Sequence, residues 1–220
     1  MSRKSGSQCC GQDFERVFDA REAERDLESW QEDGLPESTA ELIDAIRAAG
    51  VEDAMLIDIG AGVGMVHLEL LASGAAQALD VDASSAYLAT ARAEAERQGV
   101  GDRVTYRHGD VVDLADDLPP SDIVTLDRVI CCYPDLAALL GAALRPRPRL
   151  IGLVHPTDTW WVRGSLTVLN ALSWLLRRRD HFYIHRQAEI DRLLGGAGFA
   201  QLHRGGSRVW RVAVYGRSPA

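Results

Sequence analysis

The chain has 220 residues, of which 46% are hydrophobic and 25% are charged. This length and composition can bury one core of ordinary size, so we expect one globular domain with modest extensions. The formal net charge of −8 argues against a nucleic-acid partner, because such partners usually require a basic face. No stretch has the pattern of a signal peptide or a membrane span, so we expect a cytoplasmic protein.

The first 50 residues predict a helical region that precedes the main domain. A polar segment over residues 1–12 is expected to be a flexible tail. Apolar residues then recur at helical spacing, which predicts an amphipathic helix over about residues 13–32. Ser38 and Glu41 have the spacing of a capping box and predict the start of a second helix. Residues 13–50 therefore form a predicted N-terminal helical cap.

From residue 51 onward, apolar runs typical of strands alternate with helical patterns. Such a βαβ succession predicts a parallel sheet with helices on both faces. The expected strands cover residues 54–59, 76–81, 103–107, 123–126 and 150–154, with helices that begin near residues 62, 84 and 134.

The C-terminal part departs from the parallel pattern. After a helix near residues 187–194, strand-like runs over 199–204 and 208–215 are joined by Gly205-Gly206-Ser207, which is a hairpin signal. The hairpin makes the last strand antiparallel. We therefore predict an α/β fold over residues 51–220: a Rossmann-like three-layer αβα sandwich with a seven-stranded, mostly parallel sheet.

An apolar helix is inserted before the last helix, over about residues 159–179, within a predicted lid insertion at about 157–185. Three interpretations remain open for its apolar stripe. It could form a lid over a bulky apolar ligand, a dimer surface or ordinary core packing, or a peripheral contact with a membrane surface.

A glycine-rich loop with Gly60, Gly62 and Gly64 lies between a predicted strand and a predicted helix. This position is at the carboxyl edge of the sheet, where open α/β folds bind their ligands. Glycine lets the backbone approach a ligand closely. A dinucleotide site is the alternative, with Asp82 as the ribose acid, but that fingerprint places its third glycine where this chain has Met65.

The four cysteines form two adjacent pairs, Cys9-Cys10 and Cys131-Cys132. This spacing differs from that of zinc sites and redox dithiols. We expect free or buried thiols and no metal, with a cluster that joins both pairs as the alternative.

The order of Asp58, the three glycines, Asp82, Gly109-Asp110 and the terminal hairpin resembles class I S-adenosylmethionine-dependent methyltransferases over about residues 50–216. The resemblance implies S-adenosylmethionine as the cofactor. It places Gly60 and Gly62 against the methionine portion, with Asp58 supporting the loop and the amino group of the cofactor.

The same resemblance assigns the nucleoside contacts. Asp82 would accept hydrogen bonds from the ribose hydroxyls, although Asp80 on the same strand is the competing acid. Asp110 would accept from the adenine amine while the Val111 N–H meets a ring nitrogen. Gly64 and Asp127 complete the expected cofactor-binding set.

The segment 126–135, with the sequence LDRVICCYPD, is expected to border the transferred methyl group. It lacks the Asn-Pro-Pro-Tyr type of motif used on exocyclic amines. Its Tyr133-Pro134 pair resembles, less closely, that of magnesium-protoporphyrin O-methyltransferases, which methylate a propionate carboxylate. A histidine typical of that family is replaced here by Cys132.

The expected catalytic residues are Tyr133 as a hydrogen bonder and His155 as a base, although a half-buried helix-start tyrosine and a surface histidine are the plainer interpretations. The predicted reaction is methylation of a small, bulky or apolar acceptor, with a carboxylate or phenol oxygen favoured. A non-catalytic S-adenosylmethionine-binding module or sensor is the alternative, and an NAD-binding oxidoreductase is a lesser one. The sequence does not indicate the oligomeric state.

Overall fold

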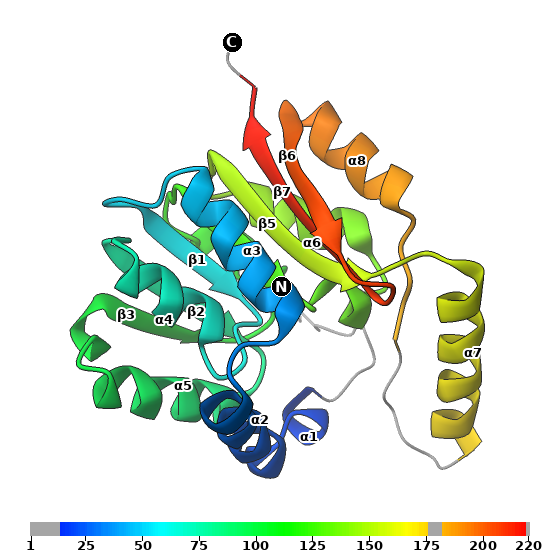
Figure 1. Ribbon diagram of the computed structural model, residues 1–220, viewed down its shortest axis with the longest axis horizontal. Coiled ribbons are helices and arrows are strands. Elements are labelled where there is room, and N and C mark those ends of the chain that lie inside the picture. The colour runs from blue at the N-terminus through cyan, green and yellow to red at the C-terminus, as the bar shows by residue number, and fades with distance from the viewer. Residues whose placement is uncertain (1–13, 176–181, 219–220) are drawn as a thin grey trace, which may run out of the picture.

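The computed structural model describes residues 14–175 and 182–218, which form a seven-stranded sheet between layers of helices (Figure 1). The order of the strands is β3-β2-β1-β4-β5-β7-β6. The strands are β1 (Met55–Ile59), β2 (Gln77–Asp82), β3 (Val104–His108), β4 (Ile123–Asp127), β5 (Leu150–Pro156), β6 (Phe199–Gly206) and β7 (Trp210–Arg217).

The α-helices are α1 (Phe14–Val17), α2 (Ala20–Asp33), α3 (Glu37–Ala48), α4 (Met65–Ala72), α5 (Ser85–Arg97), α6 (Leu136–Leu144), α7 (Trp160–Leu175) and α8 (Gln187–Gly196). Short 3-10 helices cover Gly101–Arg103 (η1), Ala115–Asp117 (η2) and Ile130–Cys132 (η3).

Strand pairing confirms the predicted topology. Strands β1 to β5 pair in parallel, whereas β7 pairs antiparallel with both β5 and β6. Parallel pairing brings the carboxyl ends of β1, β2 and β4 to one edge of the sheet. That edge is where the topology of an open α/β sheet leaves room for a ligand.

The core has two halves because side chains alternate between the two faces of each strand. On one face, Leu56 packs with residues of α3 and α4 such as Leu42 and Leu70. On the other face, Ile57 packs with residues of α6 and α8, among them Leu139. Burying each such aliphatic side chain contributes roughly 1.5–3 kcal/mol.

The N-terminal region differs from the sequence-based prediction in two details. The helix expected over residues 13–32 is broken, because the Asp19 carboxylate accepts hydrogen bonds from the backbone N–H groups of Arg21 and Glu22 and starts α2 as a new helix. The predicted capping box is also wrong. Helix α3 starts at Glu37, and the Ser38 hydroxyl lies inside the helix.

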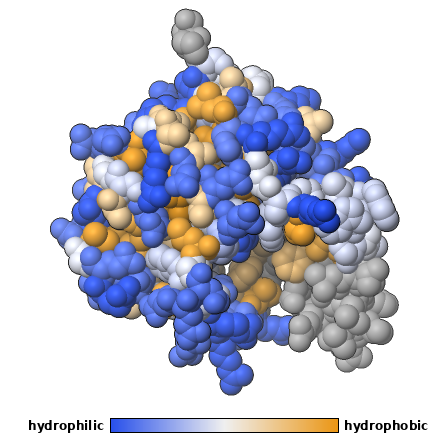
Figure 2. All heavy atoms as spheres, in the orientation of Figure 1, coloured by the Kyte–Doolittle hydropathy of each residue, from blue (hydrophilic) through white to orange (hydrophobic). Residues whose placement is uncertain are grey.

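The apolar insertion forms α7, which stands apart from the sheet in Figure 1. Trp160 at its start is 85% exposed. In the described ranges, no helix is long and apolar enough to cross a membrane. A hollow with hydrophobic side chains at its base lies between the N-terminal helices and α7 (Figure 2).

Candidate active site

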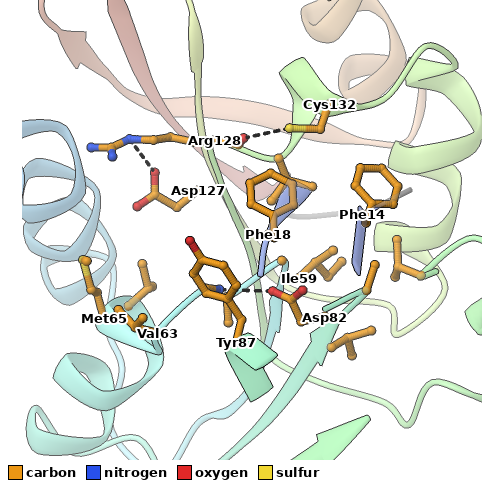
Figure 3. Close-up of a pocket in the computed structure, with 18 of the residues that line it drawn as sticks. Phe14, Phe18, Ile59, Val63, Met65, Asp82, Tyr87, Asp127, Arg128 and Cys132 are labelled. Carbon is orange, nitrogen blue, oxygen red and sulfur yellow. Dashed lines mark hydrogen bonds and ion pairs between the residues drawn. The ribbon is translucent and has the colours of Figure 1, made fainter. Parts of the chain in front are cut away.

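A cavity of about 260 Å³ opens at the carboxyl edge of the sheet, where β1, β2 and β4 end. Figure 3 shows aromatic side chains of the N-terminal region across from the ends of these strands. The cavity is lined by Phe14, Phe18, Asp26, Thr39, Ile59, Gly60, Ala61, Gly62, Val63, Met65, Val66, Val81, Asp82, Ala83, Tyr87, Gly109, Asp110, Val111, Asp127, Arg128, Val129, Cys132 and Tyr133.

The glycine loop forms one wall of the cavity. Gly60 and Gly62 both line it and have φ of 61° and 59°, a region that non-glycine residues rarely adopt. A Cβ atom on Gly60 would lie 2.6 Å from Cγ2 of Val129, so a side chain does not fit there. Gly64 has φ of 91° and precedes α4, but it does not line the cavity.

Asp82 places a carboxylate at the cavity, at the end of β2. It accepts hydrogen bonds from the backbone N–H groups of Gly62 at 3.2 Å and Ser84 at 2.8 Å, which tie β2 to the glycine loop. Burial raises the pKa of Asp82 from its usual value to about 6, against the lowering effect of these two N–H groups. The carboxylate is therefore mostly ionised at neutral pH and can act as an acceptor.

Asp58 and Asp80 lie deeper and do not line the cavity. Asp58 accepts a hydrogen bond from the Thr125 hydroxyl at 2.7 Å, and its other oxygen lies 3.1 Å from Nδ1 of His67. This arrangement supports the loop from beneath and does not present Asp58 to a cofactor. Of the two competing ribose acids, only Asp82 reaches the cavity.

Asp80 is fully buried, and neither of its oxygens has a hydrogen-bond partner among the described residues. Burial, followed by the charges of Asp58 and Asp82, raises the pKa of Asp80 well above its usual value. A raised folded-state pKa stabilises the fold at low pH. This contribution is lost as the pH rises from the unfolded pKa of about 3.9 toward the folded one.

We therefore expect Asp80→Asn to flatten the pH dependence of the free energy of unfolding above about pH 4. Each unit by which the folded pKa exceeds the unfolded pKa corresponds to about 1.4 kcal/mol that the wild type loses and the variant does not. Urea unfolding at pH 5 and pH 7.5 checks this. The same change in the free energy of unfolding between these two pH values in both proteins would contradict it.

Asp110 and Tyr133, assigned to different roles above, bond to each other in the structure. The Tyr133 hydroxyl donates to Oδ1 of Asp110, which also accepts from the Val112 N–H at 2.9 Å. Burial raises the pKa of Asp110. The Tyr133 ring stacks on Phe14 with centroids 6.5 Å apart. In this arrangement, the expected adenine acceptor and the expected catalytic phenol are paired across the cavity wall.

Asp127 lies at the end of β4 and faces the cavity. Its Oδ2 accepts a hydrogen bond from the Thr39 hydroxyl at 2.6 Å. Its Oδ1 is buried and makes no hydrogen bond within the described part of the chain. Burial raises the pKa of Asp127, partly offset by Thr39 and Arg128.

Comparison with known proteins adds a family resemblance to this geometry. Residues 56–146, which contain the glycine loop, Asp82, Asp110 and Asp127, match the family model of a methyltransferase domain. This segment of the chain is therefore similar to a methyltransferase domain. A comparison with curated proteins found no match.

Solved structures of methyltransferases have the same fold as this chain. The magnesium protoporphyrin IX methyltransferase of Synechocystis PCC 6803 with bound SAH is similar with a TM-score of 0.66 and 21% identity, over 97% of this chain and 89% of that one. A putative sarcosine dimethylglycine methyltransferase of Galdieria sulphuraria has a TM-score of 0.67 and 12% identity, over 82% and 85% of the two chains.

An O-methyltransferase family protein of Burkholderia thailandensis has a TM-score of 0.67 and 19% identity, over 93% of this chain and 63% of that one. These likenesses establish the fold, which is that of class I S-adenosylmethionine-dependent methyltransferases.

His155 does not line the cavity, so the structure does not bring the expected base together with the other expected site residues. Alternation along β5 puts its side chain on the same face as Leu153, in the layer covered by α6 and α8. It is 2% exposed, and its Nδ1 lies 3.0 Å from the Pro156 carbonyl oxygen. Burial lowers the pKa of His155, so the imidazole is neutral at neutral pH.

Several residues at the methyltransferase cavity were not identified from the sequence. Tyr87 covers the glycine loop from α5, and its hydroxyl donates to Asp26 of α2 at 2.5 Å. Thr39 and Arg128 join α3 to the end of β4. Tyr87 lies in the first turn of the helix that follows Asp82, a signal that sequence reasoning could have used. The partner of Thr39, in contrast, is 88 positions away.

Cys131 and Cys132 are free thiols with sulfur atoms 4.0 Å apart, and Cys132 lines the cavity. The hydrogen bond between the two thiols lowers the pKa of Cys132. The same hydrogen bond, together with burial, raises the pKa of Cys131. Cys9 and Cys10 lie outside the described residues, so a cluster of both pairs stays untested.

Proposed function

We propose that this protein transfers a methyl group from S-adenosylmethionine to a small, bulky or apolar acceptor, and that the acceptor atom is a carboxylate or phenol oxygen. The observation that carries the proposal is one cavity shared by the glycine loop, the Asp82 carboxylate and the aromatic N-terminal segment. The matched family model and the class I fold support it.

The residues present fit the cofactor. Gly60 leaves the loop surface free of side chains, so a ligand can approach the backbone closely. Asp82 offers an acceptor-only carboxylate for ribose hydroxyls, and Val111 lines the wall where adenine contacts are expected. Asp127, whose Oδ1 is free of protein hydrogen bonds in the described ranges, suits the cationic amino group of the methionine portion.

Bound S-adenosylmethionine supplies an electrophilic methyl group for in-line displacement. The protein's own contribution is to align the acceptor and to exclude water. Phe14 and Phe18 line the cavity on its N-terminal side and stack with their ring centroids 6.3 Å apart. We assign both tasks, alignment and exclusion of water, to these two rings.

The proton inventory of the cavity favours an acceptor that is already anionic. The cavity lining within the described residues contains no histidine, and the Tyr133 hydroxyl already donates a hydrogen bond to Asp110. A carboxylate acceptor has no proton to lose and therefore needs no base. A phenol acceptor would need one, and the oxygen of Asp127 that is free of protein hydrogen bonds is already assigned to the amino group of the cofactor.

Incubation with methyl-labelled S-adenosylmethionine and small-molecule extracts tests the proposal. We expect label in a product that base hydrolysis releases as methanol if the acceptor is a carboxylate. Cofactor binding without any transfer would support the alternative of a non-catalytic binding module or sensor. Binding of NAD instead of S-adenosylmethionine would support an oxidoreductase.

The interpretation of the α7 segment as a lid makes a separate prediction. The described side chains of α7 do not line the cavity. Replacing residues 159–179 by a short flexible link should leave cofactor affinity within about a few-fold while transfer collapses. Affinity and transfer rate are compared in a variant with an unchanged cooperative melt. Normal turnover would show that the segment is an interface or a membrane contact.

A further inference from the structure

We propose that Arg128 binds an acidic group of the methyl acceptor, and that the acceptor carries this group in addition to the atom that is methylated. The inference rests on the proposed function. It concerns the residue that follows β4, at the point where the methyltransferase cavity adjoins a second recess.

Arg128 lines both spaces. The second recess has a volume of about 230 Å³ and is formed by the start of α3 and the β6–β7 hairpin. Its lining residues are Pro36, Glu37, Ser38, Glu41, Arg128, Gly206, Ser207 and Trp210. Arg128 and Asp127 adjoin at the cavity edge (Figure 3), so we place the acidic group at the guanidinium and the remainder of the acceptor in the cavity.

The backbone of Arg128 is held in an unusual conformation. Its φ is 61°, in the left-handed region that few non-glycine residues adopt. The Arg128 N–H donates to the Val154 carbonyl at 2.9 Å, and its carbonyl oxygen accepts from the Cys131 thiol. Such outliers persist where the surrounding structure holds them, often at ligand-binding sites.

The guanidinium retains unused hydrogen-bonding capacity. It has five N–H donors, and its one hydrogen bond to a described residue runs from Nη2 to the Ser38 hydroxyl at 3.2 Å. Nε is buried without a hydrogen-bond partner among these residues and forms an ion pair with Oδ1 of Asp127 at 3.8 Å, so the donors that remain for a ligand are those of Nη1 and Nη2. The guanidinium carbon lies over the Trp210 ring, 5.1 Å from its centroid, and this contact helps to hold the group in place.

The neighbouring carboxylates do not use up this donor edge. Glu41 is held by His203 Nε2 at 2.8 Å and by the Gly206 N–H at 2.9 Å. Asp127 accepts from Thr39 through Oδ2, and its Oδ1 forms an ion pair with Nε of Arg128 at 3.8 Å. A planar guanidinium with free donors and a fixed orientation matches a carboxylate or a similar oxyanion, which can accept two parallel hydrogen bonds.

A matched pair of aromatic probes tests the inference. In protein saturated with S-adenosylhomocysteine, calorimetry compares 1-naphthoate with 1-naphthamide, which has the same shape but no charge. We expect the acid to bind about tenfold more tightly or better, the scale of a charge-assisted hydrogen bond. Equal affinities, or no binding of the acid, would overturn the inference.

Variants assign the effect to the side chain. Arg128→Gln should remove the preference for the acid, and Arg128→Lys should keep part of it because the charge remains without the fork. Arg92→Gln is the matched control, because Arg92 also lies over a ring, that of Tyr106 at 4.5 Å, but does not line either space. A preference that survives in a cooperatively melting Arg128→Gln variant would refute the role.

The outcome is separable from that of the proposed function. If the wild type does not bind S-adenosylhomocysteine, or does not transfer a methyl group, the methyltransferase proposal itself is refuted. Normal cofactor binding and transfer, with no acid preference, would refute only the role of Arg128.

Discussion

Asp82→Ala is expected to weaken S-adenosylmethionine binding by about 10- to 150-fold, which corresponds to about 1.5–3 kcal/mol for hydrogen bonds to a charged group. The carboxylate faces the cavity and is fixed by N–H groups of Gly62 and Ser84. Removing it deletes the proposed ribose acceptor and also loosens the junction between β2 and the glycine loop. Titration calorimetry of the wild type and the variant measures the loss.

The matched control is Asp80→Asn, which changes a buried acid on the same strand that does not line the cavity. It should leave cofactor affinity close to that of the wild type. Since burial raises the pKa of Asp82 to about 6, the wild-type affinity should also fall as the pH drops below about 6 and the carboxylate is protonated. Unchanged affinity in cooperatively folded Asp82→Ala would refute the ribose assignment.

Replacing both Phe14 and Phe18 by alanine is expected to reduce methyl transfer on the order of 100-fold, the scale of a misplaced reactant. These rings continue an aromatic row from Tyr133, on which Phe14 stacks, to Tyr87, which Phe18 meets edge-on with centroids 5.9 Å apart. Without them the cavity is open to water on the N-terminal side. Single-turnover rates with the acceptor that the labelling screen identifies give the measurement.

The control for this double variant is Leu202→Ala, which truncates a large apolar side chain of β6 that is 59% exposed and does not line the cavity. It should transfer methyl groups at the wild-type rate. The aromatic variant should keep a cooperative melt, because Phe14 and Phe18 are only partly buried. If it transfers normally, the N-terminal segment does not cover the reacting groups.

The amino-acid sequence by itself determined the order of the elements, the parallel sheet with its antiparallel hairpin and the place of the glycine loop. These features depend on local patterns: apolar residues that alternate along strands, helical spacing, and glycines between a strand and a helix. The position of Asp82 at the end of its strand follows from the same patterns, because the carboxyl ends of parallel strands meet at one edge.

Only the tertiary structure decided which side chains meet. Strand periodicity did not distinguish Asp80 from Asp82, since both lie on one face, and the choice depends on how far the glycine loop covers the strand. Contacts between distant segments decide three further features. They pair Tyr133 with Asp110, bury His155, and place Arg128 beside Ser38 and Trp210. Local spacing carries no information about such contacts, because they are fixed by packing between elements rather than by the conformation of any one of them.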